Sequence, residues 1–291
     1  MRRLFAALLV AAMSFNAACA PTAPNSRAAL AQQAEVSERL AAELRREGKL
    51  VEDAALNRYV RAIAARIAAV RPPGAVPLTV HIVKDADVNA FTPGGGHVFV
   101  NAGMIAAMEN EAQLAMVLAH EAAHIDRGHV IAGQRAGAAI GLAAAGGAIL
   151  AGALGAPAEL TRLAAGGVQS VAYNAFSRTQ EEDADLVGLR YAAAAGYDVV
   201  EGARSFEVLR RIYGEQSDLA NFFLSSHPRS SEREARLIAA ARRMGAAGGR
   251  VAEAEYLRRT AKLRRQVLRY YEAKGRAREA AQLRRNLRRM R

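Results

Sequence analysis

The 291-residue sequence has no tryptophan, a single cysteine and few aromatic residues, which make up 5% of the chain. One cysteine cannot form an intrachain disulfide, so a fold held together by disulfides is excluded. Hydrophobic residues account for 52% of the chain, which excludes an intrinsically disordered protein. Alanine is the most frequent of these apolar residues, and it favours helices and fills little core volume. The length allows one large domain or two ordinary ones.

The positive charge is concentrated at the C-terminal end. The formal net charge is +12, and residues 250–291 contribute +11 of it, with 15 Lys or Arg and 4 Asp or Glu. The rest of the chain is therefore nearly neutral, and the basic character says little about the main domain. The tail carries no recognised base-reading motif, so we predict no nucleic-acid partner. Contact with anionic lipid or an acidic protein surface is favoured instead.

The N-terminal end has the features of a bacterial export signal. Two arginines follow the first methionine, and residues 4–15 form an apolar run that is short for a membrane span. Small residues then precede Cys19. We predict a lipoprotein-type signal peptide over residues 1–19, cleaved before Cys19, which would carry a lipid anchor in the membrane. Residues 20–27 would be a tether. Cleavage after Ala20, which would give a soluble exported protein, is the alternative.

Helices dominate the predicted secondary structure. Helical periodicity is found over residues 28–47, 52–70, 110–129, 179–195, 199–213 and 231–244. Strands at 78–83 and 97–101, separated by a glycine turn, predict a small sheet. The fold class is therefore mainly α with a small β-sheet (α+β). We predict one domain over residues 28–244, followed at 250–291 by a basic helical hairpin with a tetratricopeptide-like hinge.

Residues 136–158 form a run of 23 positions without a charged residue. This length would suffice for a membrane span. Alanine and glycine make up most of the run, however, and it contains only five Leu or Ile. We therefore expect a buried helical hairpin broken near Gly146 and Gly147, with a membrane span or a membrane-contacting segment as alternatives.

Three of the six histidines lie within ten residues, in the stretch "HEAAHIDRGH" that begins at His120. His120 and His124 are four residues apart, so they share a helix face and can bind one zinc ion. Glu121 is turned away from the metal but lies near enough to reach an attacking water, as a general base must. His129 would lie half a turn off this face on a continuous helix, so we expect it to make local hydrogen bonds.

A catalytic zinc keeps three protein ligands and one open position, so a further ligand must come from another element. The acidic stretch "QEEDAD" supplies candidates. Glu181 and Asp185 are four apart on one helix face, so Glu181 can bind metal while Asp185 holds the second ring nitrogen of a ligand histidine. Spacing alone does not choose Glu181 over Glu182 or Asp183. An acidic first turn that stabilises its own helix would also explain these charges.

The chain resembles the gluzincin peptidases of family M48, which include the CAAX prenyl endoproteases, HtpX and BepA-like periplasmic proteases. The resemblance covers about residues 35–236 and depends on four motifs in family order: "NAFTPGGGHVFVNAGMI", "LAHEAAHIDRGH", "SRTQEEDADLVGLRYAAAAGYD" and "FLSSHPRSSER". It implies a zincin-like metallopeptidase fold with one Zn²⁺ per chain. It also implies His120, His124 and Glu181 as metal ligands, Glu121 as the base and Asp185 behind a ligand.

The resemblance makes two further implications. His227 is expected near the metal, where it stabilises the oxyanion or occupies the open zinc position; a surface histidine that caps the next helix is the alternative. The glycine-flanked segment from Gly95 to Asn101 is expected to be an edge strand that binds the substrate backbone. Its implied substrate-binding residues are Gly95, Gly96, His97, Val98 and Phe99.

The sequence therefore predicts a zinc-dependent endopeptidase of the bacterial cell envelope. The export signal favours a periplasmic enzyme with a lipid anchor in the outer membrane, and misfolded or unassembled envelope proteins are the expected substrates. The alternative is a periplasmic assembly factor or holdase with a latent or structural zinc site. Glu121 argues against a structural site, because structural zinc has four protein ligands and needs no base.

Overall fold

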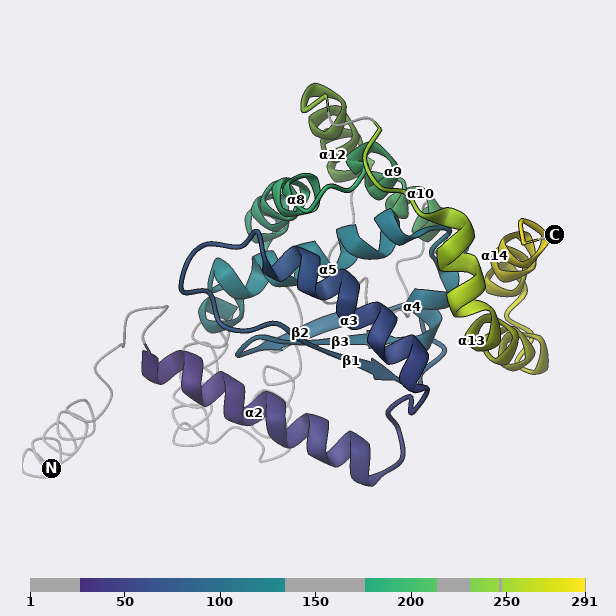
Figure 1. Cartoon of the computed structure of the whole chain (residues 1–291), viewed down its shortest axis with the longest axis horizontal. Coiled ribbons are helices and arrows are strands. Elements are labelled where there is room, and N and C mark those ends of the chain that lie inside the picture. Colours follow the sequence, from purple (N-terminus) through teal and green to yellow (C-terminus); the bar gives the residue numbers. More distant parts are fainter. Residues whose placement is uncertain (1–26, 134–175, 214–230, 246–247, 291) are drawn as a thin grey trace, which may run out of the picture.

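The computed structural model describes residues 27–133, 176–213, 231–245 and 248–290 (Figure 1). The predicted signal peptide with Cys19, the uncharged segment 136–158 and His227 lie outside the described residues. The described chain is mainly helical and contains one small sheet, which confirms the predicted fold class. None of the helices in the described ranges is both long and apolar enough to cross a membrane.

The sheet has three strands in the order β1 (Thr79–Val83), β3 (His97–Asn101) and β2 (Ala90–Gly94). β3 runs parallel to β1 and antiparallel to β2. The sequence predicted β1 and β3 but not β2. The proline and glycines at the end of β2 disfavour a strand, and a bulge between Phe91 and Gly94 accommodates them.

The two faces of the sheet pack against different helices. Alternate side chains of β1 and β3, such as Val80 and Val98, join the main core with α3 (Ala54–Ala68) and α5 (Glu111–Asp126). The opposite face carries Phe99 and packs against α2 (Arg27–Arg46) in a smaller cluster. Figure 1 shows this order, with the sheet between α2 and the helices that carry the site.

The helix that carries the two clustered histidines begins and ends at clear signals. Asn110 caps α5, its side chain accepting a hydrogen bond from the backbone of Gln113. The helix ends at Asp126, three residues before the predicted end, because Gly128 adopts a left-handed conformation with φ of 68°. Residues 129–133 are helical again, so the chain changes direction immediately before His129.

The acidic motif lies on α8 (Arg178–Ala194), which crosses α5. Ser177 and Gln180 form a capping box at its start. After α8 the chain forms two short helices, α9 (Val199–Ala203) and α10 (Ser205–Tyr213), where the sequence predicted one helix. α12 (Ser231–Arg243) then packs on both α8 and α9.

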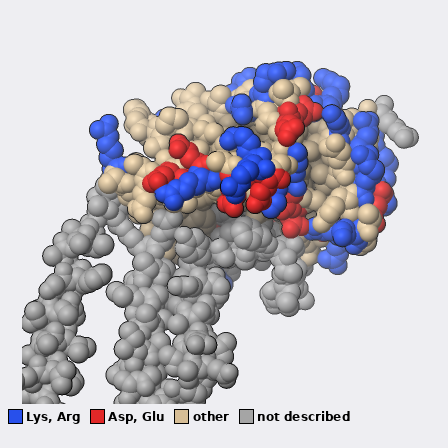
Figure 2. All heavy atoms as spheres, turned by 90° about the horizontal axis from the view of Figure 1, so that it is seen from below, with Lys and Arg blue, Asp and Glu red and all other residues tan. Residues whose placement is uncertain are grey.

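The basic tail forms the predicted helical hairpin, α13 (Glu253–Ala273) and α14 (Ala277–Arg288), and packs on the body of the protein. Its apolar side chains belong to the main core. Arg264 is completely buried, and its guanidinium donates to the carbonyl oxygens of Ala106 and Met108 at the end of α4 (Ala102–Ala107). Figure 2 shows Lys and Arg side chains on the side where this hairpin lies, at the right of the view, and also over the middle of this face.

Candidate metal centre

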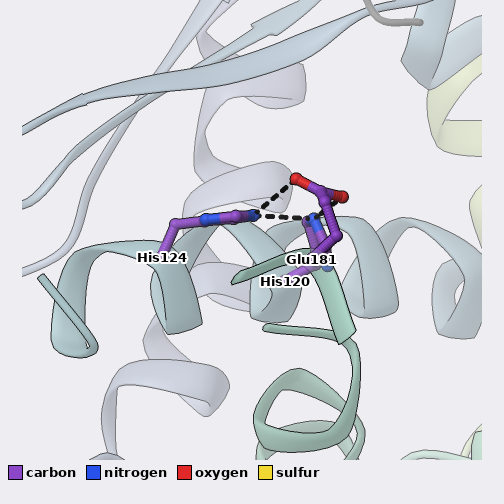
Figure 3. A group of neighbouring side chains, drawn as sticks. All are labelled: His120, His124 and Glu181. Atoms are coloured by element: carbon purple, nitrogen blue, oxygen red, sulfur yellow. Dashed lines mark hydrogen bonds and ion pairs between the residues drawn. The ribbon is translucent and has the colours of Figure 1, made fainter. Parts of the chain in front are cut away.

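Two helices bring three potential metal ligands together, as Figure 3 shows. α5 supplies His120 and His124, and α8 supplies Glu181. The Nε2 atoms of the two histidines lie 3.0 Å apart, and Nε2 of His124 lies 3.3 Å from Oε1 of Glu181. The third separation, from Nε2 of His120 to Oε2 of Glu181, is 3.6 Å. The choice of Glu181 over its acidic neighbours, which the sequence left open, is therefore the one that the geometry favours.

The spacing of these donor atoms fits a divalent metal ion. Ligand atoms held about 2.0–2.2 Å from a tetrahedral zinc lie roughly 3.3–3.6 Å from one another. The two separations to Glu181 fall in this range, and the 3.0 Å between the two histidines is slightly shorter. Two imidazoles and one carboxylate form a donor set common in catalytic zinc sites. His120 is 7% exposed, and His124, Glu181 and Glu121 are completely buried. Such a cluster of buried polar groups is well explained if a cation lies between them.

An acidic side chain orients the first ligand histidine. Nδ1 of His120 lies 3.0 Å from Oδ1 of Asp185, so the ring can donate to the carboxylate through Nδ1 while Nε2 faces the metal position. Burial by itself would raise the pKa of Asp185. The hydrogen bonds from His120 and Arg233 outweigh burial and hold this pKa below its usual value. Asp185 therefore stays ionised and fixes the ring of His120.

Arg233 on α12 links the ligand carboxylate to this second carboxylate. Its Nη1 lies 2.7 Å from Oε2 of Glu181, and its Nε lies 2.7 Å from Oδ2 of Asp185. The side chain is 4% exposed, so the ion pairs are shielded from water. Burial by itself would lower the pKa of Arg233. The carboxylates of Asp185 and Glu181 outweigh burial and raise this pKa above its usual value, so the guanidinium remains charged. The sequence does not reveal this role, although Arg233 lies within the motif "FLSSHPRSSER".

His129 lies beside His124 on its other side. Nδ1 of His129 is 3.1 Å from Nδ1 of His124, and Nε2 of His129 is 3.2 Å from Oδ2 of Asp183. The expectation that His129 makes local hydrogen bonds agrees with this geometry. The assumption of a continuous helix was wrong, because the turn at Gly128 brings His129 back toward the site. Phe176 stacks on the ring of His124 at 3.8 Å between ring centroids.

The strand expected to bind substrate requires a correction. β3 is the central strand and pairs on both edges, so its backbone cannot also pair with a substrate. Val98 and Phe99 are completely buried. Gly95 and Gly96 form the β2–β3 turn, where a β-carbon on Gly95 would lie 2.2 Å from the backbone nitrogen of Ala34 on α2. Among the described residues, β1 and β2 are the two edge strands, and the outer edge of β1 is partly covered by the bridge between Leu50 and Val83.

His97, the remaining member of the expected substrate group, is engaged within the sheet. Its Nδ1 lies 3.1 Å from Nε2 of His81 on the neighbouring strand, and the two rings stack. Burial lowers the pKa of His81 to about 4, and the neighbouring His97 acts in the same direction. This pair lies on the face that packs against α2, away from the face that packs on α5.

A helix with two histidines one turn apart, a glutamate beside the first, and a carboxylate from a second helix is the arrangement of a gluzincin-type metallopeptidase. A model of peptidase family M48 matches residues 51–241, which is more than half of the chain. The chain therefore belongs to peptidase family M48.

Curated relatives agree with this class. The beta-barrel assembly-enhancing protease of Escherichia coli K12 is 27% identical over 184 residues, 61% of this chain and 37% of that protein. The mitochondrial metalloendopeptidase OMA1 of Schizosaccharomyces pombe is 33% identical over 178 residues, 60% of this chain and 50% of that protein. Metalloprotease YcaL of Escherichia coli K12 is 32% identical over 158 residues, 54% of this chain and 59% of that protein. The chain thus spans from about a third to three fifths of the length of the relatives it matches.

Proposed function

We propose that the protein is a zinc-dependent endopeptidase of the bacterial cell envelope that cleaves misfolded or unassembled proteins. The observation that carries this proposal is the buried group of His120, His124 and Glu181, with Glu121 directly beside the first ligand. Family membership and the names of the relatives support a metalloendopeptidase. Zinc is the metal that best suits two imidazoles and a carboxylate at tetrahedral spacing.

The donor set supports a catalytic rather than a structural metal. A structural zinc is closed by four protein ligands, whereas a catalytic zinc has three and leaves one position open. Within the described part of the chain, the group that could hold a metal has three members. Asp185 is close but is directed at the outer nitrogen of His120, so it orients a ligand and does not complete the set.

The chemistry follows from the positions of the chain's own residues. When bound, zinc would polarise the scissile carbonyl and make an attacking water more acidic. Glu121 takes the proton from this water and then transfers it to the leaving amine. Asp185 holds the ring of His120, and Arg233 holds the carboxylates of Glu181 and Asp185 in place. These fixed groups need little rearrangement during the reaction.

We propose that the substrate aligns along the edge strand β2 instead of the central strand β3. β2 packs against α5, the helix with both ligand histidines, so a peptide added at this edge would run close to the metal. An added strand is held mainly by main-chain hydrogen bonds. Recognition would then depend on an extended, unfolded backbone more than on side chains, which suits misfolded or unassembled substrates.

The cellular setting is also part of the proposal. The N-terminal sequence favours export to the periplasm and a lipid anchor on Cys19 in the outer membrane. The name of the Escherichia coli relative, a beta-barrel assembly-enhancing protease, agrees with an envelope role. Labelling with radioactive palmitate, with Cys19→Ser as the control, would test the anchor. Absence of label in the wild type would mean that the protein is exported without it.

An assembly factor or holdase with a latent zinc site is the second candidate. This candidate depends on His227, because a histidine that occupies the open zinc position would block catalysis. His227→Ala should raise peptidase activity if this histidine blocks the metal. It should lower kcat with little change in KM if His227 stabilises the oxyanion. Unchanged kinetics and zinc affinity would exclude both roles.

The decisive experiment measures zinc and peptidase activity together. We expect the purified protein to contain about one zinc per chain and to cleave casein. Glu121→Gln should retain the zinc and lose cleavage, because Glu121 moves a proton and does not bind the metal. A wild type that binds zinc but does not cleave would favour the latent alternative. Equal rates in the wild type and Glu121→Gln would remove Glu121 from the mechanism.

A further inference from the structure

We propose that His129 and Asp183 are positioning residues for His124, joined to it in a chain of hydrogen bonds that runs from the metal position to the protein surface. This inference depends on the proposed function, since it assigns a role toward the metal. It concerns two residues that are not ligands and that come from different elements. His129 follows α5, and Asp183 lies on α8.

The geometry places His129 between the other two groups. Its Nδ1 lies 3.1 Å from Nδ1 of His124, and its Nε2 lies 3.2 Å from Oδ2 of Asp183. Both separations allow hydrogen bonds. His129 is 8% exposed, so water does not readily replace these contacts. The left-handed turn at Gly128 allows a histidine five residues after His124 to face its ring, which a continuous helix would prevent.

When a metal is bound, only one direction of hydrogen-bond donation is consistent for the series His124, His129 and Asp183. Nε2 of His124 faces the other two ligands and must present a lone pair to the metal, so the proton of this ring is on Nδ1. Nδ1 of His124 then donates to Nδ1 of His129. The neutral ring of His129 carries its own proton on Nε2, which donates to Asp183. Each donor in the series therefore has an acceptor: His124 donates to His129, and His129 donates to Asp183.

The two ligand histidines are supported differently. His120 is held directly by Asp185, a buried carboxylate that is paired with Arg233. His124 is held by a neutral ring, and the carboxylate behind that ring belongs to Asp183, whose side chain is 31% exposed and also pairs with Arg127. The hydrogen bonds behind His124 thus lead to Asp183 at the surface, whereas the carboxylate behind His120 is buried inside the protein.

The test compares variants that remove or keep the acceptor at position 129. Zinc affinity is measured by competition with a chromophoric chelator at neutral pH. His129→Phe keeps a ring but removes the acceptor for His124, and we expect affinity to fall by about 10- to 100-fold. His129→Asn places an amide oxygen near the position of Nδ1 and should restore most of the affinity. Rescue by asparagine would not be expected if the histidine only filled space.

Two surface variants complete the experiment. Asp183→Ala removes the last acceptor in this series of hydrogen bonds. It should weaken zinc binding by about 10-fold, the lower end of the range expected for His129→Phe. Arg127→Ala removes only the exposed partner of Asp183 and should bind zinc like the wild type. Asp183→Ala also decides the question if His129→Phe does not fold. Thermal unfolding of each metal-free variant shows whether it is folded.

Wild-type zinc affinity in a folded His129→Phe, or in Asp183→Ala if the phenylalanine variant does not fold, would overturn the proposal. A further readout is the histidine tautomer in the zinc-loaded protein, observed by ¹⁵N NMR. We expect a neutral His129 with its proton on Nε2. A proton on Nδ1 of His129 would equally overturn the proposed direction of donation. A wild type that binds no zinc would instead contradict the proposed function itself.

Discussion

Gly188 on α8 lies directly against the backbone of His120 on α5. A β-carbon built on Gly188 would lie 2.9 Å from the backbone nitrogen of His120 and 3.0 Å from its Cα. Real β-carbons essentially never approach backbone atoms this closely, so the two helices cross here because position 188 has no side chain. This crossing places Asp185 and Glu181, about one and two turns earlier on α8, beside the ligand histidines.

Gly188→Ala should therefore weaken the metal centre. Alanine is preferred to glycine in a helix by about 1 kcal/mol, so helix propensity alone predicts a more stable protein. We expect the opposite, because α8 must move away from His120 and carry Glu181 with it. Zinc affinity and the thermal midpoint should both fall. Leu186→Ala, on the exposed side of the same helix, is the control and should retain zinc. A more stable Gly188→Ala with unchanged zinc affinity would show that the crossing is not limiting.

The identity of the third ligand can be tested with neighbouring glutamates. Glu181→Ala should lose zinc on dialysis at neutral pH, because it removes one of three donors. Glu182→Ala should keep its zinc, since Glu182 is half exposed and pairs with Arg236 at the surface. Metal content by atomic absorption distinguishes the two variants. If Glu182→Ala were the metal-poor protein, the ligand would have been assigned one residue out of register.

Arg233 allows a test of stability that does not depend on catalysis. Arg233→Met leaves the carboxylates of Glu181 and Asp185 buried without their cation, and removing one partner from a buried ion pair costs about 3–5 kcal/mol. The loss in free energy of unfolding should be largest with EDTA present and smaller with zinc, which would compensate Glu181. Urea denaturation under both conditions measures it.

Arg236→Met is the matched control for Arg233→Met. It lies on the same helix, and its exposed ion pair with Glu182 should contribute no more than about 1 kcal/mol. Equal losses in the two variants, or a loss in Arg233→Met that zinc does not reduce, would contradict this account of the buried arginine.

Local sequence signals predicted the parts of the site that lie on single helices. The spacing of His120 and His124, and of Glu181 and Asp185, is a property of one helix each, so periodicity was enough to place them on common faces. The choice among neighbouring acidic residues needed the position of α8 relative to α5. That position depends on the close packing at Gly188, which no local pattern reveals.

The incorrect predictions have different origins. The resemblance implied that β3 is an edge strand, and β2, which pairs with it, was not predicted because its proline and glycines disfavour a strand. The helix before His129 was extended too far because Gly128 was not read as its end, although glycine just after a helical pattern is a known stop signal. Arg233 is distant in sequence from the residues that it pairs with, so only the fold brings it to them.

The last prediction concerns a buried carboxylate away from the metal. Glu111, at the start of α5, accepts hydrogen bonds from Tyr59 and Tyr197 and pairs with Arg250, which leads into the C-terminal hairpin. Burial alone would raise the pKa of Glu111. The bonds from Arg250 and the two tyrosines outweigh burial and lower this pKa below its ordinary value of 4.5.

The sign of the pH dependence follows from this lowered pKa. The folded state binds the proton of Glu111 less readily than the unfolded state, so the stabilisation is complete above about pH 4.5 and is lost as pH falls through the folded-state pKa. Glu111→Gln resembles the protonated residue, and it should be less stable than the wild type by about 1.5–3 kcal/mol at pH 7. The difference should shrink progressively below about pH 4.5. Urea denaturation of both proteins in EDTA, from pH 7 to pH 3, measures it; a difference that stays constant over this range would show that Glu111 does not titrate as described.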